Sequence, residues 1–432
     1  MLLVVSKILL LEMYKIIYVS YHYPPSNSIG SLRSFNQAQA LRELGHKVKV
    51  LYAGNENNRF VKNNTIKNHF DDHCLIDEVS VENSKSGFIT QIKKIILRTV
   101  PNKIINLANA FLIYFMGESP RWISKKVVND AIEIHTNFKP DIIISTCGPL
   151  ENHIFASKLK EIQDCYWIAE YRDCWSCNTM AFSENPLEIP SRLLRHKERK
   201  SIQKVDLILA VSPTIQKYYR EFFYKKTILV YSGWVEYDYP INQPRIINKH
   251  NNKLKILHLG SMLHGRRSPI NIFNIFERNK EIRNSFEMYF IGRDTDVFTK
   301  KLSNTKYAKD SIFLNNEINN FQARDEGRAA DLLLILMMEH KGDQNTVTGK
   351  IYEYIYLQKP IIILDSHNSE ASKIISNYKL GYICKDQFSL ERLLCEIAQN
   401  GINIEIADEI RDKFKVSNCM GLLLKKIVNE TN

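Results

Sequence analysis

Three junctions between a predicted strand and a predicted helix combine a glycine with basic side chains, and they are the places where this chain could do chemistry. The most informative is TGKIYEYIYLQKPIIIL, residues 348–364, in which a helix opens at Gly349 and Lys350. Free backbone N–H groups at a helix start favour an anion, and a lysine beside them adds positive charge. This junction therefore predicts a phosphate-binding site.

The same helix carries Glu353, one turn after Lys350. A carboxylate at that distance from a phosphate could accept both hydroxyls of a ribose. The alternative is a glutamate that merely suits the helix dipole. We expect Thr346 or Thr348 to cap the helix, and we expect Glu353 to be largely buried and to need partners, because its neighbours are apolar.

Two further junctions repeat the arrangement. In YHYPPSNSIGSLRSF, Gly30 precedes a helix and Arg33 lies on its first turn, although no G-x-G-x-x-G dinucleotide motif is present. In HLGSMLHGRRSP, Gly260 follows a strand, and Arg266 and Arg267 enter a helix where they could hold phosphate oxygens. The alternative for the Gly30 junction is an ordinary strand–helix turn. The alternative for the Arg266–Arg267 junction is a solvated helix start.

A fourth group, Arg172, Asp173 and Trp175, follows the predicted strand YWIAEY. Asp173 could orient or deprotonate an acceptor hydroxyl, or it could be a structural ion-pair residue. His22 and His153 are weaker candidates. Asp294-Thr295-Asp296 resembles a metal-binding tripeptide by chance, and we expect no metal and no cofactor.

Short apolar runs alternate with helical patterns along the chain, which favours parallel, doubly wound sheets. A chain of 432 residues is too long for one core. We predict an N-terminal domain over 1–235, a polar linker over 236–253, a C-terminal domain over 254–402, and helices over 403–432 that pack back toward the first domain. The predicted strands are Lys15–Ser20, Lys47–Tyr52, Asp141–Ser145, Tyr166–Tyr171, Asp206–Val211, Thr227–Tyr231, Lys255–Gly260, Phe286–Gly292, Ser311–Asn315, Asp331–Leu336, Pro360–Leu364 and Leu380–Cys384.

The formal net charge of +12 indicates an anionic partner. From Ser84 to Lys126 there are eight lysines and arginines against one acid, Glu118, interleaved with apolar residues. Such a segment is typical of a protein that docks on an anionic membrane, and a solvated face is the alternative. No nucleic-acid-binding module accompanies the charge.

The remaining signals concern location. No apolar run reaches the length of a membrane-spanning helix, and Ile104–Met116 predicts a core or interfacial helix. The first residues faintly resemble a signal peptide but lack a basic start and an A-x-A site. We therefore expect Met13 to be the start, and a weak membrane tether is the alternative. Cys174 and Cys177 form a lone C-x-x-C without the partners of a zinc site, so we expect reduced cysteines in a cytoplasmic protein.

Five stretches together resemble the retaining glycosyltransferases of family 4, which have the two-domain GT-B fold. The similarity extends over nearly the whole chain and is most specific in the last stretch. The stretches are YPPSNSIGSLRSFNQAQALRELGHKVKVLY, DIIISTCGPLENHIFASKL, WIAEYRDCW, HLGSMLHGRRSP and TGKIYEYIYLQKPIIIL. The RDxW element is typical of a branch that builds surface polysaccharides.

The resemblance implies a nucleotide-sugar donor bound mainly by the second domain. Arg266 matches the family's basic residue for the diphosphate, Glu353 matches its ribose-binding glutamate, and Gly30 would lie against the donor phosphate and sugar. Two positions depart from the family pattern. Asn345 stands where the family has a carboxylate near the donor sugar, and Ser261 stands where it often has a basic residue.

The sequence thus predicts two Rossmann-like domains whose parallel sheets face a central cleft. Their activity would be transfer of a sugar from a nucleoside diphosphate to a lipid-linked or growing glycan, with retention and without a metal, at the inner face of the cell membrane. The predicted donor-binding residues are Gly30, Arg33, Arg266, Thr348, Gly349, Lys350 and Glu353, and the predicted catalytic residues are Arg172 and Asp173. Two alternatives stay open: a nucleotide-sugar 2-epimerase on the same fold, and a non-catalytic nucleotide-sugar-binding subunit.

Overall fold

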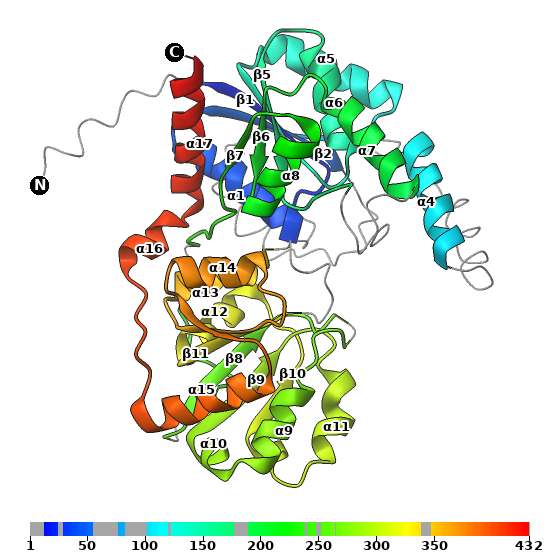
Figure 1. The fold of residues 1–432 in the computed structure, drawn as a ribbon. Coiled ribbons are helices and arrows are strands. Elements are labelled where there is room, and N and C mark those ends of the chain that lie inside the picture. The colour runs from blue at the N-terminus through cyan, green and yellow to red at the C-terminus, as the bar shows by residue number, and fades with distance from the viewer. Residues whose placement is uncertain are drawn as a thin grey trace, which may run out of the picture. The chain divides into compact units, whose positions relative to one another are not determined.

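The chain forms two compact α/β units in the computed structural model. The first consists of Met1–Tyr231 together with Val416–Asn432, and the second of Ser232–Lys415. The structure describes residues 13–24, 29–54, 77–82, 102–119, 122–176, 189–237, 241–247, 252–263, 265–337 and 347–431. Figure 1 shows the ribbon of the chain with its elements labelled.

The first unit is built on a seven-stranded parallel sheet with the strand order β3-β2-β1-β4-β5-β6-β7. Its strands are β1 (Lys15–Ser20), β2 (Lys47–Gly54), β3 (Asp77–Glu82), β4 (Ile142–Thr146), β5 (Tyr166–Tyr171), β6 (Leu207–Ala210) and β7 (Thr227–Leu229). The central strands are apolar because helices cover both faces of a doubly wound sheet. Strands β1, β4 and β5 are buried over nearly their whole length.

The second unit repeats this plan with a six-stranded parallel sheet of order β10-β9-β8-β11-β12-β13. Its strands are β8 (Leu254–Leu259), β9 (Phe286–Ile291), β10 (Ile312–Asn315), β11 (Leu332–Leu336), β12 (Ile361–Leu364) and β13 (Gly381–Cys384). Both sheets therefore have the doubly wound order of Rossmann-like domains. The predicted fold class is confirmed.

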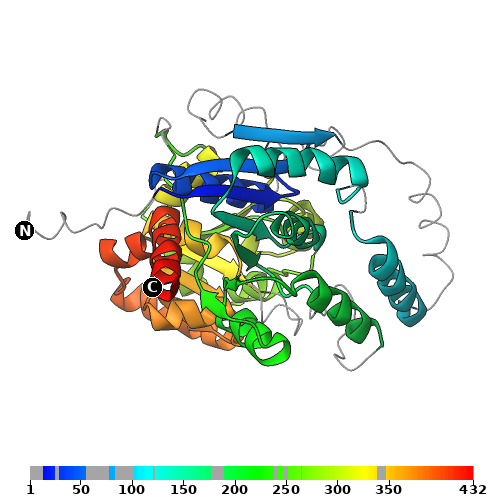
Figure 2. The same cartoon turned by 90° about the horizontal axis from the view of Figure 1, so that it is seen from above.

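The helices of the first unit are α1 (Ile29–Glu43), α4 (Asn102–Met116), α5 (Lys125–Phe138), α6 (Glu151–Lys160), α7 (Ile189–Ser201), α8 (Pro213–Phe223) and α17 (Val416–Thr431). Although α17 is the last helix of the chain, it packs on α1, as Figure 1 shows. Figure 2 shows β3 at the edge of the sheet beside β2. Sequence analysis missed β3 because its sequence, DEVSVE, is polar at alternate positions, as an edge strand can be.

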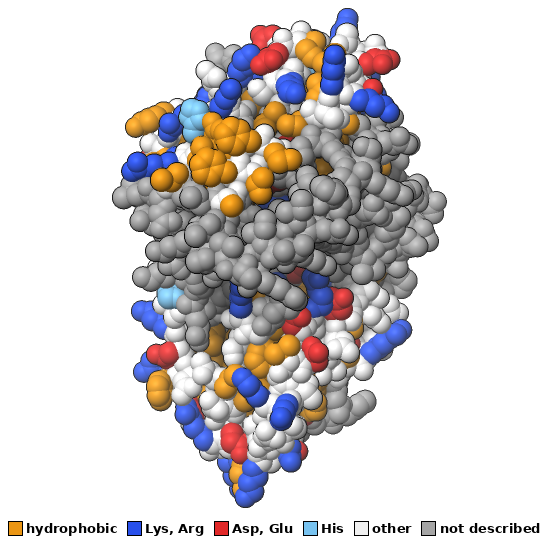
Figure 3. All heavy atoms as spheres, turned by 90° about the vertical axis from the view of Figure 1, so that its right-hand side faces the viewer, with side chains coloured by type: hydrophobic (Ala, Val, Ile, Leu, Met, Phe, Trp, Pro, Cys, Tyr) orange, Lys and Arg blue, Asp and Glu red, His pale blue; other side chains and the backbone are white. Residues whose placement is uncertain are grey.

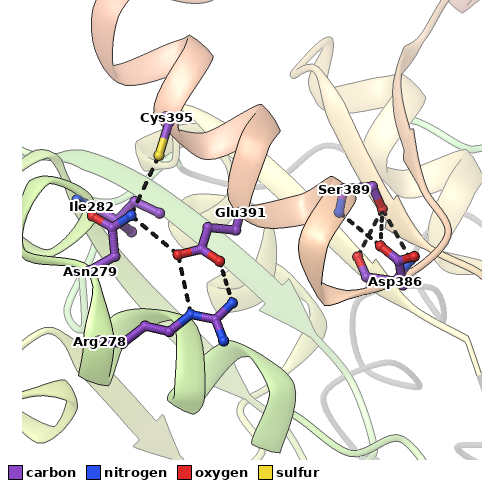
Figure 4. Close-up of polar contacts among 7 residues, drawn as sticks. All are labelled: Arg278, Asn279, Ile282, Asp386, Ser389, Glu391 and Cys395. Atoms are coloured by element: carbon purple, nitrogen blue, oxygen red, sulfur yellow. Dashed lines mark hydrogen bonds and ion pairs between the residues drawn. The ribbon is translucent and has the colours of Figure 1, made fainter.

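The helices of the second unit are α9 (Ile270–Arg278), α10 (Lys280–Ser285), α11 (Thr299–Ser303), α12 (Asn320–Ala329), α13 (Lys350–Leu357), α14 (Glu370–Asn377), α15 (Gln387–Asn400) and α16 (Asp408–Lys413), with 3-10 turns η2 (Asp296–Phe298) and η3 (Ala308–Asp310). Helix α15 is fixed to α9 and α10 by Glu391, which accepts hydrogen bonds from Arg278 and Asn279 (Figure 4). Asp386 caps the start of α15 through a capping box with Ser389.

Part of the predicted linker belongs to the second unit. The buried carboxylate of Glu326, on α12, accepts hydrogen bonds from the backbone N–H groups of Arg245, Ile246 and Ile247 at 2.6–2.9 Å. A polar, proline-rich composition predicts an irregular segment but does not say what that segment contacts. Here it is held on the surface of α12.

Candidate functional site

The strand order of each sheet reverses at one place, between β1 and β4 in the first unit and between β8 and β11 in the second. In open α/β sheets, ligands bind at such switch points, beyond the carboxyl ends of the strands. Most of the predicted site residues belong to loops or helix starts that follow these strands. The strand order therefore points to the same loops and helix starts that the sequence pattern predicts as binding sites.

In the second unit, Lys350 reaches from the start of α13 to the end of β8. Its Nζ lies 3.0 Å from Nε2 of His258. The side chain passes directly over Gly260, where an added β-carbon would lie 2.5 Å from Cε of Lys350. Gly260 also has φ of +117°, a region that favours glycine. A glycine is thus required directly after β8 for two reasons: its φ is positive, and the Lys350 side chain leaves no room for a β-carbon.

His258 is fully buried, and its protonation follows from its contacts. Its Nδ1 lies 3.0 Å from the carbonyl oxygen of Leu334, which can only accept, so Nδ1 carries the proton and Nε2 accepts from Lys350. Burial, and then the charge of Lys350, lower the pKa of His258 well below its ordinary value. Tyr354 supports the same strand end by donating to the carbonyl of Leu334 at 3.2 Å and accepting from the N–H of Leu259 at 3.0 Å. The result is a neutral histidine that orients a lysine.

Glu353, one turn further along α13, is paired with Arg324 of α12. Nε and Nη2 of Arg324 donate to the two carboxylate oxygens at 2.9 and 2.8 Å. The side chain of Glu353 is 43% exposed, whereas that of Arg324 is 4% exposed. The expectation that Glu353 is largely buried is therefore wrong, because the apolar neighbours Tyr352, Tyr354 and Ile355 turn inward and leave Glu353 at the surface.

The start of α13 differs from the expected cap. The N-cap position is Gly349, with ordinary helical dihedral angles and no side-chain cap. The N–H of Ile351 donates to the carbonyl of Thr348, so a tight backbone turn opens the helix without the Thr348 hydroxyl. The threonine cap is wrong for Thr348. Thr346 and Asn345 lie outside the described residues.

Arg266 and Arg267 follow β8 as predicted, but they differ in exposure. Arg266 is exposed and Arg267 is partly buried. The charge of Arg267 contributes to lowering the pKa of His258, after burial and Lys350. Ser261 donates to the Asp294 carboxylate at 3.1 Å. The loop after β8 therefore carries positive charge beside Lys350.

In the first unit, Arg172 lies against two glycines from neighbouring loops. A β-carbon added at Gly30 would lie 1.9 Å from Nη1 of Arg172, and one at Gly148 would lie 2.7 Å from Nη2. Burial, and then the charge of Arg172, lower the pKa of His22 to about 4. The switch point of the first sheet thus carries a guanidinium between the start of α1 and the loop after β4. That arrangement can accommodate an anion.

Arg33, which also lies on α1, faces the sheet. Its Nη2 donates at 2.5 Å to the buried carboxylate of Glu170, which also accepts from Gln37 at 2.7 Å. Burial works to raise the pKa of Glu170, but the charge of Arg33 and the hydrogen bonds lower it overall. Arg33 therefore fixes α1 to β5. Its donor-binding role stays a prediction.

Asp173 is half-exposed, and its ion pair with Arg172 is long, with 4.0 Å between Oδ2 of Asp173 and Nε of Arg172. Trp175 is buried, and its Nε1 donates to Glu118 at 3.0 Å. The next residue, Ser176, donates to the buried Glu198 of α7. The loop after β5 is thus anchored at Trp175 and Ser176, while Asp173 is available to solvent.

The sequence analysis missed several polar residues in or beside these sites. His258 and Glu170 had a signal, since each interrupts an apolar strand, KILHLG or YWIAEY. Arg324 had no local signal, because α12 reads as a polar helix. His153 is buried, with Nδ1 2.8 Å from Oγ of Ser145, and burial lowers its pKa to about 3.

Within the described ranges, no three His, Cys, Asp or Glu side chains are grouped so that they could hold a metal ion. Cys147, Cys165, Cys384, Cys395 and Cys419 are free, whereas Cys174 is disulfide-bonded. The expectation of reduced cysteines is wrong at Cys174. A cysteine in a C-x-x-C pattern is a common site of oxidation.

Solved structures with the same fold support the topology. No protein-family profile matches the chain, and no curated protein matches its sequence. Among similar structures is sucrose-phosphate synthase from Thermosynechococcus elongatus, with a TM-score of 0.62, 12% identity, and coverage of 96% of this chain and 100% of that one. The lipopolysaccharide outer core galactosyltransferase WaaB has a TM-score of 0.56, 12% identity, and coverage of 96% and 99%. A putative UDP-N-acetylglucosamine 2-epimerase from Listeria monocytogenes has a TM-score of 0.50, 12% identity, and coverage of 97% of both chains.

At this level of identity the similarity establishes the fold alone. A galactosyltransferase and a protein described as a putative 2-epimerase both have this fold, so the fold alone does not distinguish the predicted activity from that alternative.

Proposed function

We propose that this protein is a glycosyltransferase that moves a sugar from a nucleoside diphosphate to a lipid-linked or growing glycan. The observation that supports it best is the placement of Lys350. Its ammonium lies at the carboxyl end of β8, at the switch point of the second sheet, and Glu353 follows one turn later with an exposed carboxylate. A diphosphate beside Lys350 and a ribose beside Glu353 match this arrangement.

The proposed chemistry is charge stabilisation. Departure of the nucleoside diphosphate builds negative charge on its phosphates, and the cations Lys350 and Arg266 would stabilise that charge. Asp173 would orient or deprotonate the acceptor hydroxyl. We further propose retention of configuration without a metal, membership of family 4, and a role in surface polysaccharide synthesis, on the sequence resemblance described above.

The experiment that tests this proposal uses the purified chain and a panel of nucleotide sugars. Binding of one donor, together with transfer of its sugar to an acceptor glycan or glycolipid extract, would support it. Conversion of the donor alone into its 2-epimer would favour the epimerase instead. Tight binding with no turnover under any condition would favour a binding subunit.

We also propose that the first unit docks on an anionic membrane at the inner face of the cell membrane. The outer face of α4 supports this proposal, because Phe111, Leu112, Phe115 and Met116 are 42–75% exposed there. Figure 3 shows apolar side chains gathered on this unit beside lysines and arginines. Helix α7 packs on α4 and adds the exposed cations Arg192, Arg199 and Lys200.

The basic segment from Ser84 to Lys126 also supports docking on an anionic membrane. Lys125 and Lys126 are exposed, whereas Lys85, Lys93, Lys94, Arg98 and Arg121 lie outside the described residues. None of the described helices is both long enough and apolar enough to cross a bilayer. An apolar helix face bordered by cations is a surface that anionic lipid headgroups attract.

A further inference from the structure

Arg324 and Glu353 form an ion pair, but the two side chains differ in how far they are buried. Arg324 is buried almost completely, and Glu353 is nearly half-exposed. A salt bridge whose function is only to join two helices at the surface would have no need of a buried cation, because burying a charge costs free energy. The arrangement therefore needs an explanation beyond the attachment of α12 to α13.

The guanidinium of Arg324 is held by several groups of the second unit. It lies between two aromatic rings, with its central carbon 4.6 Å from the ring of Tyr237 and 4.4 Å from that of Tyr356. Its Nη2 also donates to the backbone carbonyl of Val235 at 2.8 Å. Such cation–π contacts and the carbonyl fix the plane of the guanidinium. Arg324 thus has one orientation.

That orientation determines the orientation of the carboxylate. The two N–H groups of Arg324 occupy one lone pair on each oxygen of Glu353, at 2.9 and 2.8 Å. A carboxylate has about four acceptor positions, so one remains on each oxygen. The Glu353 side chain is 43% exposed, so a ligand can reach the carboxylate and use the remaining lone pairs.

We propose that Arg324 is a positioning residue of the nucleotide site. It holds the Glu353 carboxylate in one orientation, so that its outer lone pairs accept ribose hydroxyls. Arg324 thereby sets the preference of the site for ribose over 2′-deoxyribose. This inference rests on the proposed function, since it assumes that Glu353 contacts a nucleotide.

The test compares nucleoside diphosphates with their 2′-deoxy forms. Calorimetry would measure the binding of UDP, GDP and ADP, and of dUDP, dGDP and dADP, to the wild-type chain. A hydroxyl that donates to a charged carboxylate predicts a preference for the ribose form of roughly ten- to a hundredfold. Arg324→Gln should reduce this preference to near one, because the ribose form should lose more affinity than the deoxy form. Arg324→Lys, which keeps the charge and loses the fork, should give an intermediate ratio.

The matched control is Arg278→Gln. Arg278 also forms a two-pronged contact with a glutamate of the same unit, Glu391, but on α9 and α15 (Figure 4). This variant should keep the wild-type preference for ribose. Thermal unfolding of each variant would show whether it is folded, and Glu353→Gln, which leaves Arg324 in place, provides an independent measurement if Arg324→Gln does not fold. It should lose the same preference.

Two results would overturn the inference in different ways. If a nucleoside diphosphate binds and Arg324→Gln, or Glu353→Gln in its place, keeps the full preference for ribose, then Arg324 is a structural residue and the proposed function stands. If no nucleoside diphosphate binds to the wild-type chain, the proposed function is contradicted and the inference falls with it.

Discussion

Lys350 and Glu353 share one helix turn, yet the structure holds them by different means. Lys350 is oriented by a buried, neutral histidine, and Glu353 by a buried, charged arginine. Each partner is fixed by its own hydrogen bond to a backbone carbonyl, at Leu334 or Val235. Side chains held in this way lose little further freedom when a ligand binds, which favours affinity.

At the residue scale, the first prediction concerns Glu353→Gln. The amide keeps the shape of the side chain but loses the charge, so nucleotide binding should weaken by about 1.5–3 kcal/mol, the range of a charged hydrogen bond. Calorimetry with the nucleoside diphosphate identified in the panel would measure it. Because the side chain is 43% exposed, the fold should survive. Unchanged affinity would contradict a ribose-binding role, and unfolding would support a structural one.

The second prediction is that Asp173 serves the acceptor and not the donor. Asp173→Asn should leave donor affinity nearly unchanged and lower the transfer rate by a factor on the order of 10²–10⁴ if the residue is a general base. Loss of donor affinity together with activity would contradict this prediction and would assign Asp173 to donor binding. Its ion pair with Arg172 is long and exposed, so removing it should cost at most about 1 kcal/mol of stability.

Glu161→Gln provides a control for that measurement. Glu161 is an exposed carboxylate of the same unit, paired with Lys204 at 2.9 Å, and it precedes β5, whereas the RDxW loop follows that strand. It should change neither binding nor transfer. A large fall in the thermal stability of Asp173→Asn would instead identify a structural ion pair.

At the scale of elements, α7 and α8 anchor the loop that follows β5. Glu198 on α7 is fully buried and accepts hydrogen bonds from Ser176 and, at 2.5 Å, from Tyr219. No positive side chain pairs with it among the contacts of the described residues. Burial therefore dominates and raises the pKa of Glu198 to about 7.

The third prediction follows from this pKa. A carboxyl group that binds its proton more tightly in the folded state stabilises the protein at low pH. That contribution to the free energy of unfolding is lost as the pH rises from about 4.5 to about 7, and it does not change further above pH 7. The free energy of unfolding should fall by about 3 kcal/mol over that window on account of Glu198. Glu198→Gln cannot ionise, so its stability should exceed that of the wild type increasingly over the same window.

Urea denaturation at several pH values between 5 and 8 would measure this difference. The comparison must be made between variant and wild type, because the partly buried His22 and the buried His153 have lowered pKa values and make stability rise with pH in part of the range. Glu396→Gln, at an exposed position, is the control and should give no such trend. A constant difference across the range would contradict the pKa assigned to Glu198.

At the scale of the whole molecule, the net charge of +12 attracts the chain to an anionic membrane before any close contact forms. The fourth prediction is that the chain co-sediments with vesicles of phosphatidylcholine and phosphatidylglycerol, and that this binding falls as salt screens the charges. Replacing both Phe111 and Phe115 by Ser should weaken binding, because each phenyl ring buried in the interface contributes about 1.5–3 kcal/mol.

Phe388→Ser is the matched control for the membrane experiment. Phe388 is 70% exposed, like the residues of α4, but it belongs to the second unit. Its replacement should leave vesicle binding unchanged. Equal binding to vesicles of pure phosphatidylcholine, or no binding to anionic vesicles, would contradict docking by charge.

The chain's own pattern was enough to predict the fold class and nearly all of the strands. Lys15–Ser20 and Tyr166–Tyr171 are strands with the predicted bounds. The reason is that a strand buried on both faces must be apolar along its length, and this signal lies within a few consecutive residues. The glycine-and-cation junctions were readable for the same reason, since a helix start and its neighbours are local.

Contacts between distant residues were decided only by the tertiary structure. Arg324 and Glu353 are separated by 29 positions and Lys350 and His258 by 92, and no periodic pattern within one element links them. The strand β3, too, is defined by its pairing with β2 and not by its composition. Whether Glu353 is buried or exposed depended on which face of α13 the sheet covers. The tyrosines and isoleucines beside Glu353 are buried, and this determines which face of α13 packs inward. Glu353 then lies at the edge of that face, where Arg324 of the neighbouring helix α12 pairs with it.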